Sequence, residues 1–154
     1  METEGARLAE FAGAVRESTL KRLQAVGVGR ENWRATSTSM SYADLAAHLL
    51  EADRWLFGLL DDGPSDPVVG RPGLRTVGPR SEYDSVLSEL EATGRHRTAR
   101  IAGLTDAALT RRYFDRRFGR DVTLWWAVAR GNLDHEIHHR GQISVYLRID
   151  GFAS

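Results

Sequence analysis

Apolar residues recur every three or four positions along four long stretches of this 154-residue chain. This spacing places apolar side chains on one face of an α-helix and therefore predicts four long helices. The predicted helices cover residues 6–26, 41–61, 81–104 and 123–150. Four long helices with shorter connections favour an all-α fold, a four-helix bundle that residues 1–154 form as a single domain.

Turn and capping residues mark the connections between these helices. Ser41 followed by Asp44 is a weaker relative of a capping box at the start of the second helix. Residues 63–80 contain all four prolines, and we interpret them as a loop rather than a domain linker, because neither flank is large enough to fold separately. Gly94 weakens the third helix, which would most readily break at that point. Between the third and fourth long helices, residues 113–122 are compatible with a brief strand or hairpin.

Composition and charge exclude several classes of function. The chain has 21 basic and 21 acidic residues, without the basic surplus that nucleic-acid binding usually requires. It has no cysteine, which excludes disulfides and a cysteine nucleophile and fits a reducing compartment. The first ten residues lack the apolar run of a secretory signal, and no stretch reaches the roughly 18 apolar residues of a membrane span. We therefore expect a cytoplasmic protein that binds neither nucleic acid nor membranes.

Three of the five histidines lie within five residues, at positions 135, 138 and 139. His135 and His139 are four residues apart, so on a helix they share one face and can bind a single metal ion. His138 lies about 60° to the side of His135, at the edge of this face. The most plausible third ligand is His48, which borders the apolar stripe of the second predicted helix. The sequence thus predicts a three-histidine site for a divalent metal in the bundle core, with zinc, nickel, copper and iron as candidates.

Other interpretations of these residues remain open. The run 135–139 matches the His-Glu-x-x-His pattern of zinc proteases, but neither His nor Glu follows His139, and Asp150 lies too far along the same helix. Glu136 would otherwise form a surface or inter-helix salt bridge. A lone histidine such as His48 usually hydrogen-bonds a carbonyl or carboxylate, and adjacent histidines can form an exposed run.

Several other side chains accompany the histidines on the last predicted helix. At 100° per residue, one broad face carries Trp125, Val128, His135, His139, Gln142 and Tyr146. The candidates for hydrogen-bonding the ligands or a substrate are Glu136, His138, Gln142 and Tyr146, although packing is the more common role for such residues. Trp125 is the tryptophan best placed to contact a substrate, because it shares the histidine face.

Residues 41–60 and 132–151 resemble the DinB/YfiT-like family of four-helix metal proteins. The late stretch carries the residues Asn132, His135, His139, Arg140, Gly141, Gln142 and Tyr146. The order and spacing of the helices agree with the family over nearly the whole chain. The resemblance implies a metal, usually zinc or nickel, bound by His48, His135 and His139 in a homodimer.

The same resemblance implies a thiol-dependent activity. Some relatives transfer bacillithiol or glutathione-like thiols to electrophiles, and a mycothiol-dependent isomerase shares the fold. Three protein ligands leave at least one metal position open for a thiol cosubstrate, whose pKa the metal would lower. The leading hypothesis is therefore metal-dependent transfer of a low-molecular-weight thiol to an electrophile. The alternatives are a non-catalytic metal-binding stress-response protein, whose site a fourth protein ligand would close, and an apo-protein with a vestigial site.

Overall fold

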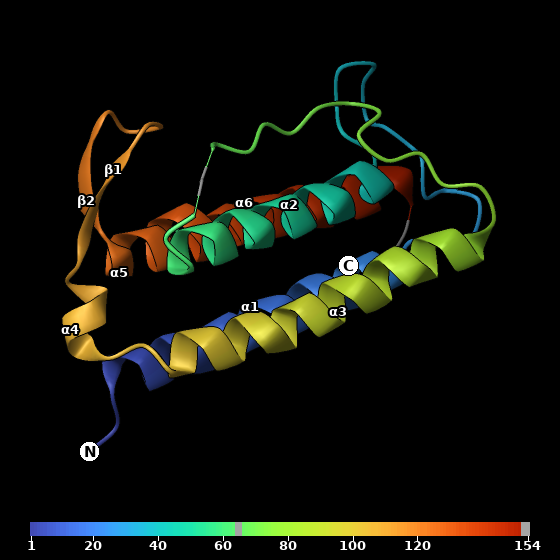
Figure 1. Ribbon diagram of the computed structural model, residues 1–154. Helices are drawn as coiled ribbons and strands as arrows, with labels where there is room; N and C mark the ends of the chain where they lie inside the picture. The colour runs from blue at the N-terminus through green and yellow to red at the C-terminus, as the bar shows by residue number, and fades with distance from the viewer. Residues whose placement is uncertain (64–65, 152–154) are drawn as a thin grey trace.

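Four long helices make up most of the computed structural model, which describes residues 1–63 and 66–151 (Figure 1). They are α1 (Glu4–Gln24), α2 (Tyr42–Leu60), α3 (Arg80–Ala102) and α6 (Asp134–Asp150). The shorter elements are α4 (Asp106–Leu109), β1 (Arg112–Asp115), β2 (Arg120–Thr123), α5 (Leu124–Trp126) and the π-helix η1 (Ala127–Leu133). None of the helices within the described ranges is both long and apolar enough to cross a membrane. The predicted all-α bundle is confirmed.

The long helices form two layers, with α1 beside α3 and α2 beside α6 (Figure 1). Arg16 on α1 contacts Glu136 on α6, and Arg22 further along α1 contacts Ser144 further along α6. These two helices are therefore parallel, while α2 and α3 run in the opposite direction (Figure 1). Because α2 and α3 point the same way, the chain between them must travel back along the length of the bundle.

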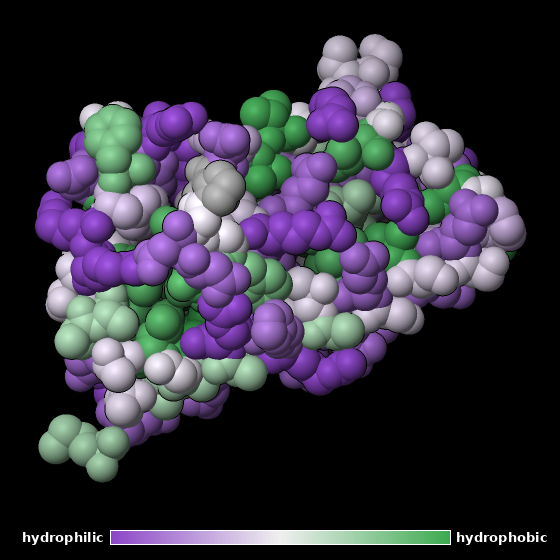
Figure 2. Space-filling view, in the orientation of Figure 1, coloured by the Kyte–Doolittle hydropathy of each residue, from purple (hydrophilic) through white to green (hydrophobic). Residues whose placement is uncertain are grey.

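The start of α2 is set by its first residues. The Ser41 hydroxyl accepts a hydrogen bond from the Asp44 amide at 3.0 Å, and the Asp44 carboxylate accepts one from the Ser41 amide at 2.9 Å. This capping box satisfies two amides that have no partner inside the helix, and it confirms the start predicted from the sequence. The apolar face that follows is fully buried in the core at Leu45, Leu49 and Leu56. Figure 2 shows one face of the molecule, on which hydrophilic residues alternate with separate apolar patches.

The connection from α2 to α3 is irregular, as predicted for residues 63–80, of which 64 and 65 lie outside the described residues. We call residues 66–79 the strap, because this segment runs over the layer of α2 and α6 (Figure 1). The buried carboxylate of Asp44 accepts hydrogen bonds from the strap amides of Gly73 at 3.0 Å and Arg75 at 2.7 Å. Polar side chains therefore hold the strap against the bundle.

The third long helix runs through Gly94 without a break, contrary to the weak point expected there. A Cβ atom at Gly94 would lie 2.7 Å from Cγ and 2.9 Å from Nη1 of Arg16. The glycine therefore gives the long Arg16 side chain room to cross α3. Packing between α1 and α3 outweighs the low helix propensity of glycine.

The last predicted helix also differs from the expectation of one α-helix over residues 123–150. A β-hairpin, compatible with the prediction, ends at Thr123, and the π-helix η1 separates α5 from α6. The wider i→i+5 turns of a π-helix shift the side chains before it relative to those after it. Trp125 is consequently 40% exposed and donates a hydrogen bond from Nε1 to Glu4 Oε1 at 2.8 Å. The prediction that Trp125 shares the histidine face is wrong.

Candidate metal centre

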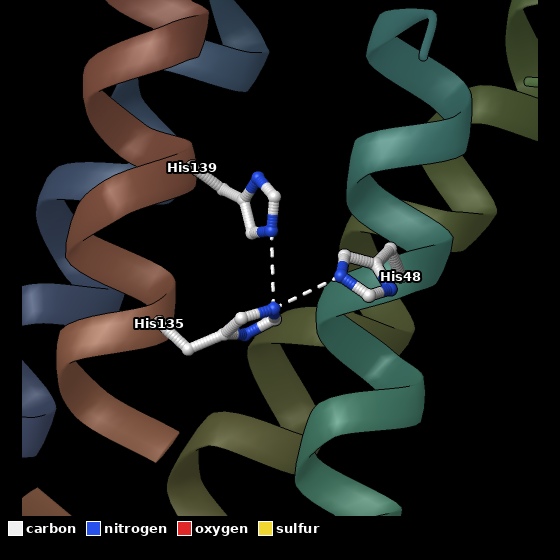
Figure 3. A group of neighbouring side chains, drawn as sticks. All are labelled: His48, His135 and His139. Carbon is white, nitrogen blue, oxygen red and sulfur yellow. Dashed lines mark hydrogen bonds between the residues drawn. The ribbon is translucent and has the colours of Figure 1, made fainter. Parts of the chain in front are cut away.

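Three histidines from two helices converge inside the bundle (Figure 3). His48 projects from α2, while His135 and His139 project from successive turns of α6 (Figure 3). Nε2 of His135 lies 2.9 Å from Nε2 of His48 and 3.0 Å from Nε2 of His139. Ligand nitrogens of the three residues lie within 4.8 Å of one another, a grouping that could hold a metal ion. The antiparallel packing of α2 against α6 thus brings together residues that are 87 positions apart.

Hydrogen bonding alone does not account well for this arrangement. A neutral imidazole has one N–H donor and one lone-pair acceptor, so the single Nε2 of His135 can make only one well-aligned hydrogen bond. Its other close contact must then share the same hydrogen or lone pair in poor alignment, or bring two lone pairs or two N–H groups together. Three lone pairs directed at one cation remove this conflict, and imidazole nitrogen is a common ligand of transition metals. The donor set therefore fits a divalent transition metal.

Gln142 fixes the orientation of one imidazole. Its Oε1 atom lies 2.5 Å from Nδ1 of His139, so Nδ1 is the atom that carries the proton. The lone pair is then on Nε2, which faces the other two histidines. Metal-binding histidines generally donate their second ring N–H to an oxygen in this way. This contact places Gln142, a residue singled out from the sequence, directly behind the candidate site.

Burial keeps the three imidazoles neutral. His48 and His139 are only 2% and 6% exposed. Burial, followed by the neighbouring His139 and His48, lowers the pKa of His135 to about 3. Burial also lowers the pKa of His139 to about 4, against the raising effect of Gln142, and it lowers the pKa of His48. All three imidazoles are therefore neutral near neutral pH, the form in which a histidine can bind a metal.

A buried charge network lies beside the histidines, with one charged residue from each long helix. Arg16 contacts Glu136 at 2.9 Å and Asp53 at 2.8 Å. Arg97 contacts Glu136 at 2.6 Å and Asp53 at 3.1 Å, and also donates to Asn132 at 3.1 Å. All five side chains are at most 4% exposed. Two cations and two anions thus balance within the core, with α1, α2, α3 and α6 joined at one level.

This network determines the role of Glu136. Burial opposes its negative charge, but Arg97 and Arg16 outweigh this effect and hold the pKa of Glu136 at about 2. Both carboxylate oxygens face the two guanidinium groups. Glu136 is therefore a buried inter-helix ion-pair residue, and it is not available as the general base that the zinc-protease pattern requires.

The remaining side chains singled out from the sequence lie at different distances from the centre. His138 is exposed and its ring packs edge-on against His139, with centroids 5.0 Å apart. Tyr146 packs edge-on against Trp33 at the border of the core. His96 is exposed on α3 and contacts Phe57 rather than the other histidines.

Three residues beside His48 carried no recognisable signal in the sequence. A Cβ atom added to Gly70 of the strap would lie 3.2 Å from Nε2 of His48 and 2.8 Å from Sδ of Met40. On the other side of the ring, His48 Nδ1 is buried without a hydrogen-bond partner among residues 1–63 and 66–151, and Glu51 Oε2 lies 3.8 Å from it. Gly70 lies beside His48 because the strap passes over α2, and Glu51 lies beside it because the two residues are one helical turn apart on α2.

The fold and the three-histidine centre place the protein in a class of helical-bundle proteins with a candidate metal site. Comparisons with known proteins identify its family. The model of the DinB superfamily matches residues 13–143, so the chain belongs to this superfamily and the resemblance noted in the sequence is confirmed. A relative, the uncharacterized protein YjoA of Bacillus subtilis (strain 168), is 29% identical over 119 residues, which are 76% of this chain and 71% of YjoA. The crystal structure of YjoA, described as a DinB-like protein, covers 94% of this chain and 92% of its own with a TM-score of 0.69 and 23% identity. This structural similarity supports the same fold.

Proposed function

We propose that His48, His135 and His139 bind one divalent metal ion, zinc or nickel, and that the protein transfers a low-molecular-weight thiol to an electrophile. The observation that carries the metal site is the convergence of three Nε2 atoms, with contacts of 2.9 and 3.0 Å, in a buried place. The thiol chemistry is supported by membership of the DinB superfamily and by the absence of cysteine from the chain. The sulfur must then come from a cosubstrate.

The chain's own residues hold and shield the reacting groups. The three imidazoles supply neutral nitrogen ligands, Gln142 orients His139, and the charge network around Glu136 compensates its own charges without competing for the metal. A divalent metal ion held by the three imidazoles would supply Lewis acidity, which would lower the pKa of a cosubstrate thiol. In the overall reaction the thiol would exchange its S–H bond for a bond from sulfur to the electrophilic carbon, the proton would pass to solvent, and the leaving group would depart with the electrons of the broken bond.

The test of the metal site is metal content, measured by elemental mass spectrometry on untagged protein. We expect about one zinc or nickel ion per chain in the wild type and a loss of most of it in His48→Ala and in His139→Ala, because each variant removes one of three ligands. His96→Ala is the matched control, since His96 is exposed and contacts Phe57 instead. Circular dichroism of each variant establishes that the helices are retained.

Each result has a definite consequence. Wild-type protein that contains no metal and binds none on titration would overturn the proposal. If His48→Ala retains the metal and His139→Ala loses it, the site lies on α6 alone. If the metal site holds, a thiol-transfer assay with a chromogenic electrophile separates the enzyme from a non-catalytic metal-binding protein, which would show no turnover.

We also propose that the protein is a cytoplasmic homodimer, and the superfamily resemblance supports the homodimer. Light scattering on purified protein measures the mass directly. A homodimer has twice the 17.2 kDa mass of one chain, and a mass of one chain at micromolar concentration would contradict this part of the proposal.

A further inference from the structure

We propose that Gly70 is a specificity-determining residue that keeps the space beside the three histidines open to an exogenous ligand. The ligand is a small molecule with a metal-binding sulfur or anionic donor atom, and it enters from a groove between α2 and the strap. This inference rests on the proposed metal site and adds to it a residue and a route of access.

The groove adjoins His48 through Glu51, and it adjoins Gly70 through that residue's two neighbours in the strap. It has a volume of about 570 Å³, and it is lined by Glu51, Arg54 and Trp55 of α2 and by residues 66–69 and Arg71 of the strap. Glu51 lies 3.8 Å from His48 Nδ1, and the lining residues 69 and 71 flank Gly70. The volume lies in the range of about 300–1,000 Å³ that is typical of small-molecule sites. The body of a ligand in this groove would lie beside Glu51, the neighbour of His48, and beside the strap residues that flank Gly70.

Gly70 lies between two lining residues of the groove, Val69 and Arg71, and beside His48. A Cβ atom at this position would lie 3.2 Å from His48 Nε2, the nitrogen that faces His135, and 2.8 Å from Sδ and Cε of Met40. Any side chain there would occupy space beside the atom proposed to bind the metal. Among the described residues, positive φ angles occur at other glycines but not at Gly70. The backbone conformation therefore does not require glycine at position 70. A methyl group there would displace the flexible end of Met40 and lie against His48 Nε2.

The strap is held at a defined distance from α2. Asp44 binds the amides of Gly73 and Arg75, and Asn32 exchanges hydrogen bonds of 2.7 and 3.0 Å with the backbone of Val77. Moving the strap outward at position 70 would strain the hydrogen bonds at Gly73 and Arg75, which follow within five residues. The added methyl group must instead displace Met40 or fill the space beside His48.

The test uses protein loaded with Co²⁺, whose visible spectrum reports its ligands, and two probes, azide and 2-mercaptoethanol. We expect Gly70→Ala to retain Co²⁺ but to bind both probes at least about tenfold more weakly than the wild type. Gly78→Ala is the matched control: it lies in the same strap, and its added Cβ would make only ordinary contacts with Glu82, at 3.5 Å or more. Its probe affinities should stay within about twofold of the wild type.

A second pair of variants removes the clash with Met40. Met40→Ala and Met40→Ala/Gly70→Ala differ only in the methyl group beside His48, so a weaker response of the double variant to the probes isolates that contact even if Gly70→Ala folds poorly. The inference would be overturned if Gly70→Ala bound the probes as tightly as the wild type and Met40→Ala/Gly70→Ala bound them as tightly as Met40→Ala. Loss of Co²⁺ itself from both variants with alanine at position 70 would also overturn it, because Gly70 would then shape the metal site rather than admit a ligand.

The same measurements separate this inference from the proposed function. Wild-type protein that binds no Co²⁺ would overturn the metal site, and the inference with it. Wild-type protein that binds Co²⁺ and azide but not the thiol would overturn thiol transfer, while weaker azide binding by Gly70→Ala would still support the role of Gly70. Normal thiol binding by both Gly70→Ala and the wild type would overturn the inference and leave the proposed function standing.

Discussion

At the scale of single residues, the surroundings of each ionisable side chain determine its charge and its role. Glu136 and His135 are neighbours in the chain, yet they face different environments. Glu136 stays ionised because Arg16 and Arg97 surround its carboxylate, whereas burial keeps His135 neutral. Breaking a buried ion pair is costly because it leaves the partner's charge without compensation.

The first prediction at this scale concerns Glu136→Gln. The variant should lower the free energy of unfolding by about 3–5 kcal/mol, because Arg16 and Arg97 would lose one of their two buried anions. Glu89→Gln is the control, since its 2.9 Å ion pair with Arg54 is solvent-exposed and should contribute only about 0–1 kcal/mol. Urea unfolding of both variants without metal measures the difference. Equal losses in the two variants would show that the buried network contributes little.

At the scale of secondary-structure elements, two glycines in long helices have opposite surroundings. A Cβ atom at Gly94 on α3 would collide with Arg16, whereas one at Gly141 on α6 would have nothing within 4 Å apart from its own helix. The same substitution should therefore have opposite effects at the two positions. In both cases the intrinsic gain in helix propensity from Gly to Ala is about 1 kcal/mol or less.

For Gly141→Ala we expect a gain in unfolding free energy of up to about 1 kcal/mol. For Gly94→Ala we expect a loss of about 1–3 kcal/mol, because overpacking against Arg16 exceeds the gain in propensity. Thermal and urea unfolding of the two variants measure both signs. Stabilisation by alanine at position 94 would mean that Arg16 moves aside without cost.

The π-helix η1 is the second feature at the element scale. It lies directly before α6 and ends one residue before Asp134, the first residue of the helix that carries His135 and His139. Leu124, Val128 and Leu133 are all buried around it. The wider turns allow the residues on either side to be buried together, although a continuous α-helix would orient them differently.

At the scale of the whole molecule, the histidines should make the stability of the metal-free protein depend on pH. Their ordinary pKa is 6.5, and burial lowers it to about 3 in His135 and about 4 in His139. Between these values the unfolded chain binds protons that the folded protein does not, so the free energy of unfolding falls as pH falls from 6.5 towards 4. Glu136 acts only at lower pH, since its pKa falls from 4.5 to about 2.

This pH dependence can be measured by urea unfolding of metal-free protein at about pH 7.5 and about pH 5. The wild type should lose more stability between the two conditions than a variant in which His48, His135 and His139 are all glutamine, which does not titrate. Parallel losses would show that the three imidazoles are protonated in the folded protein.

Excess zinc should raise the stability of the wild type by mass action near pH 7.5, by about 2.7 kcal/mol at a hundred times the dissociation constant.

The sequence by itself determined most of the architecture of this protein and its main candidate residues. Periodic apolar positions are a local property of the chain, so they indicated four long helices, and Ser41 with Asp44 indicated the start of α2. The spacing of His135 and His139 likewise depends only on helix geometry. His48 was a hypothesis from the chain alone, because its partners lie 87 or more positions away.

Only the tertiary structure decided what depends on contacts between distant segments. The antiparallel packing of α2 and α6 brings His48 to the other histidines, and Arg16 from another helix explains why α3 continues through Gly94. The π-helix that turns Trp125 away from the histidines depends on packing around it, which a helical wheel does not represent. Gly70 lies beside His48 because the strap, which Asp44 and Asn32 hold, passes over α2. Local spacing specifies helices and their faces, whereas packing between distant segments determines what each face meets.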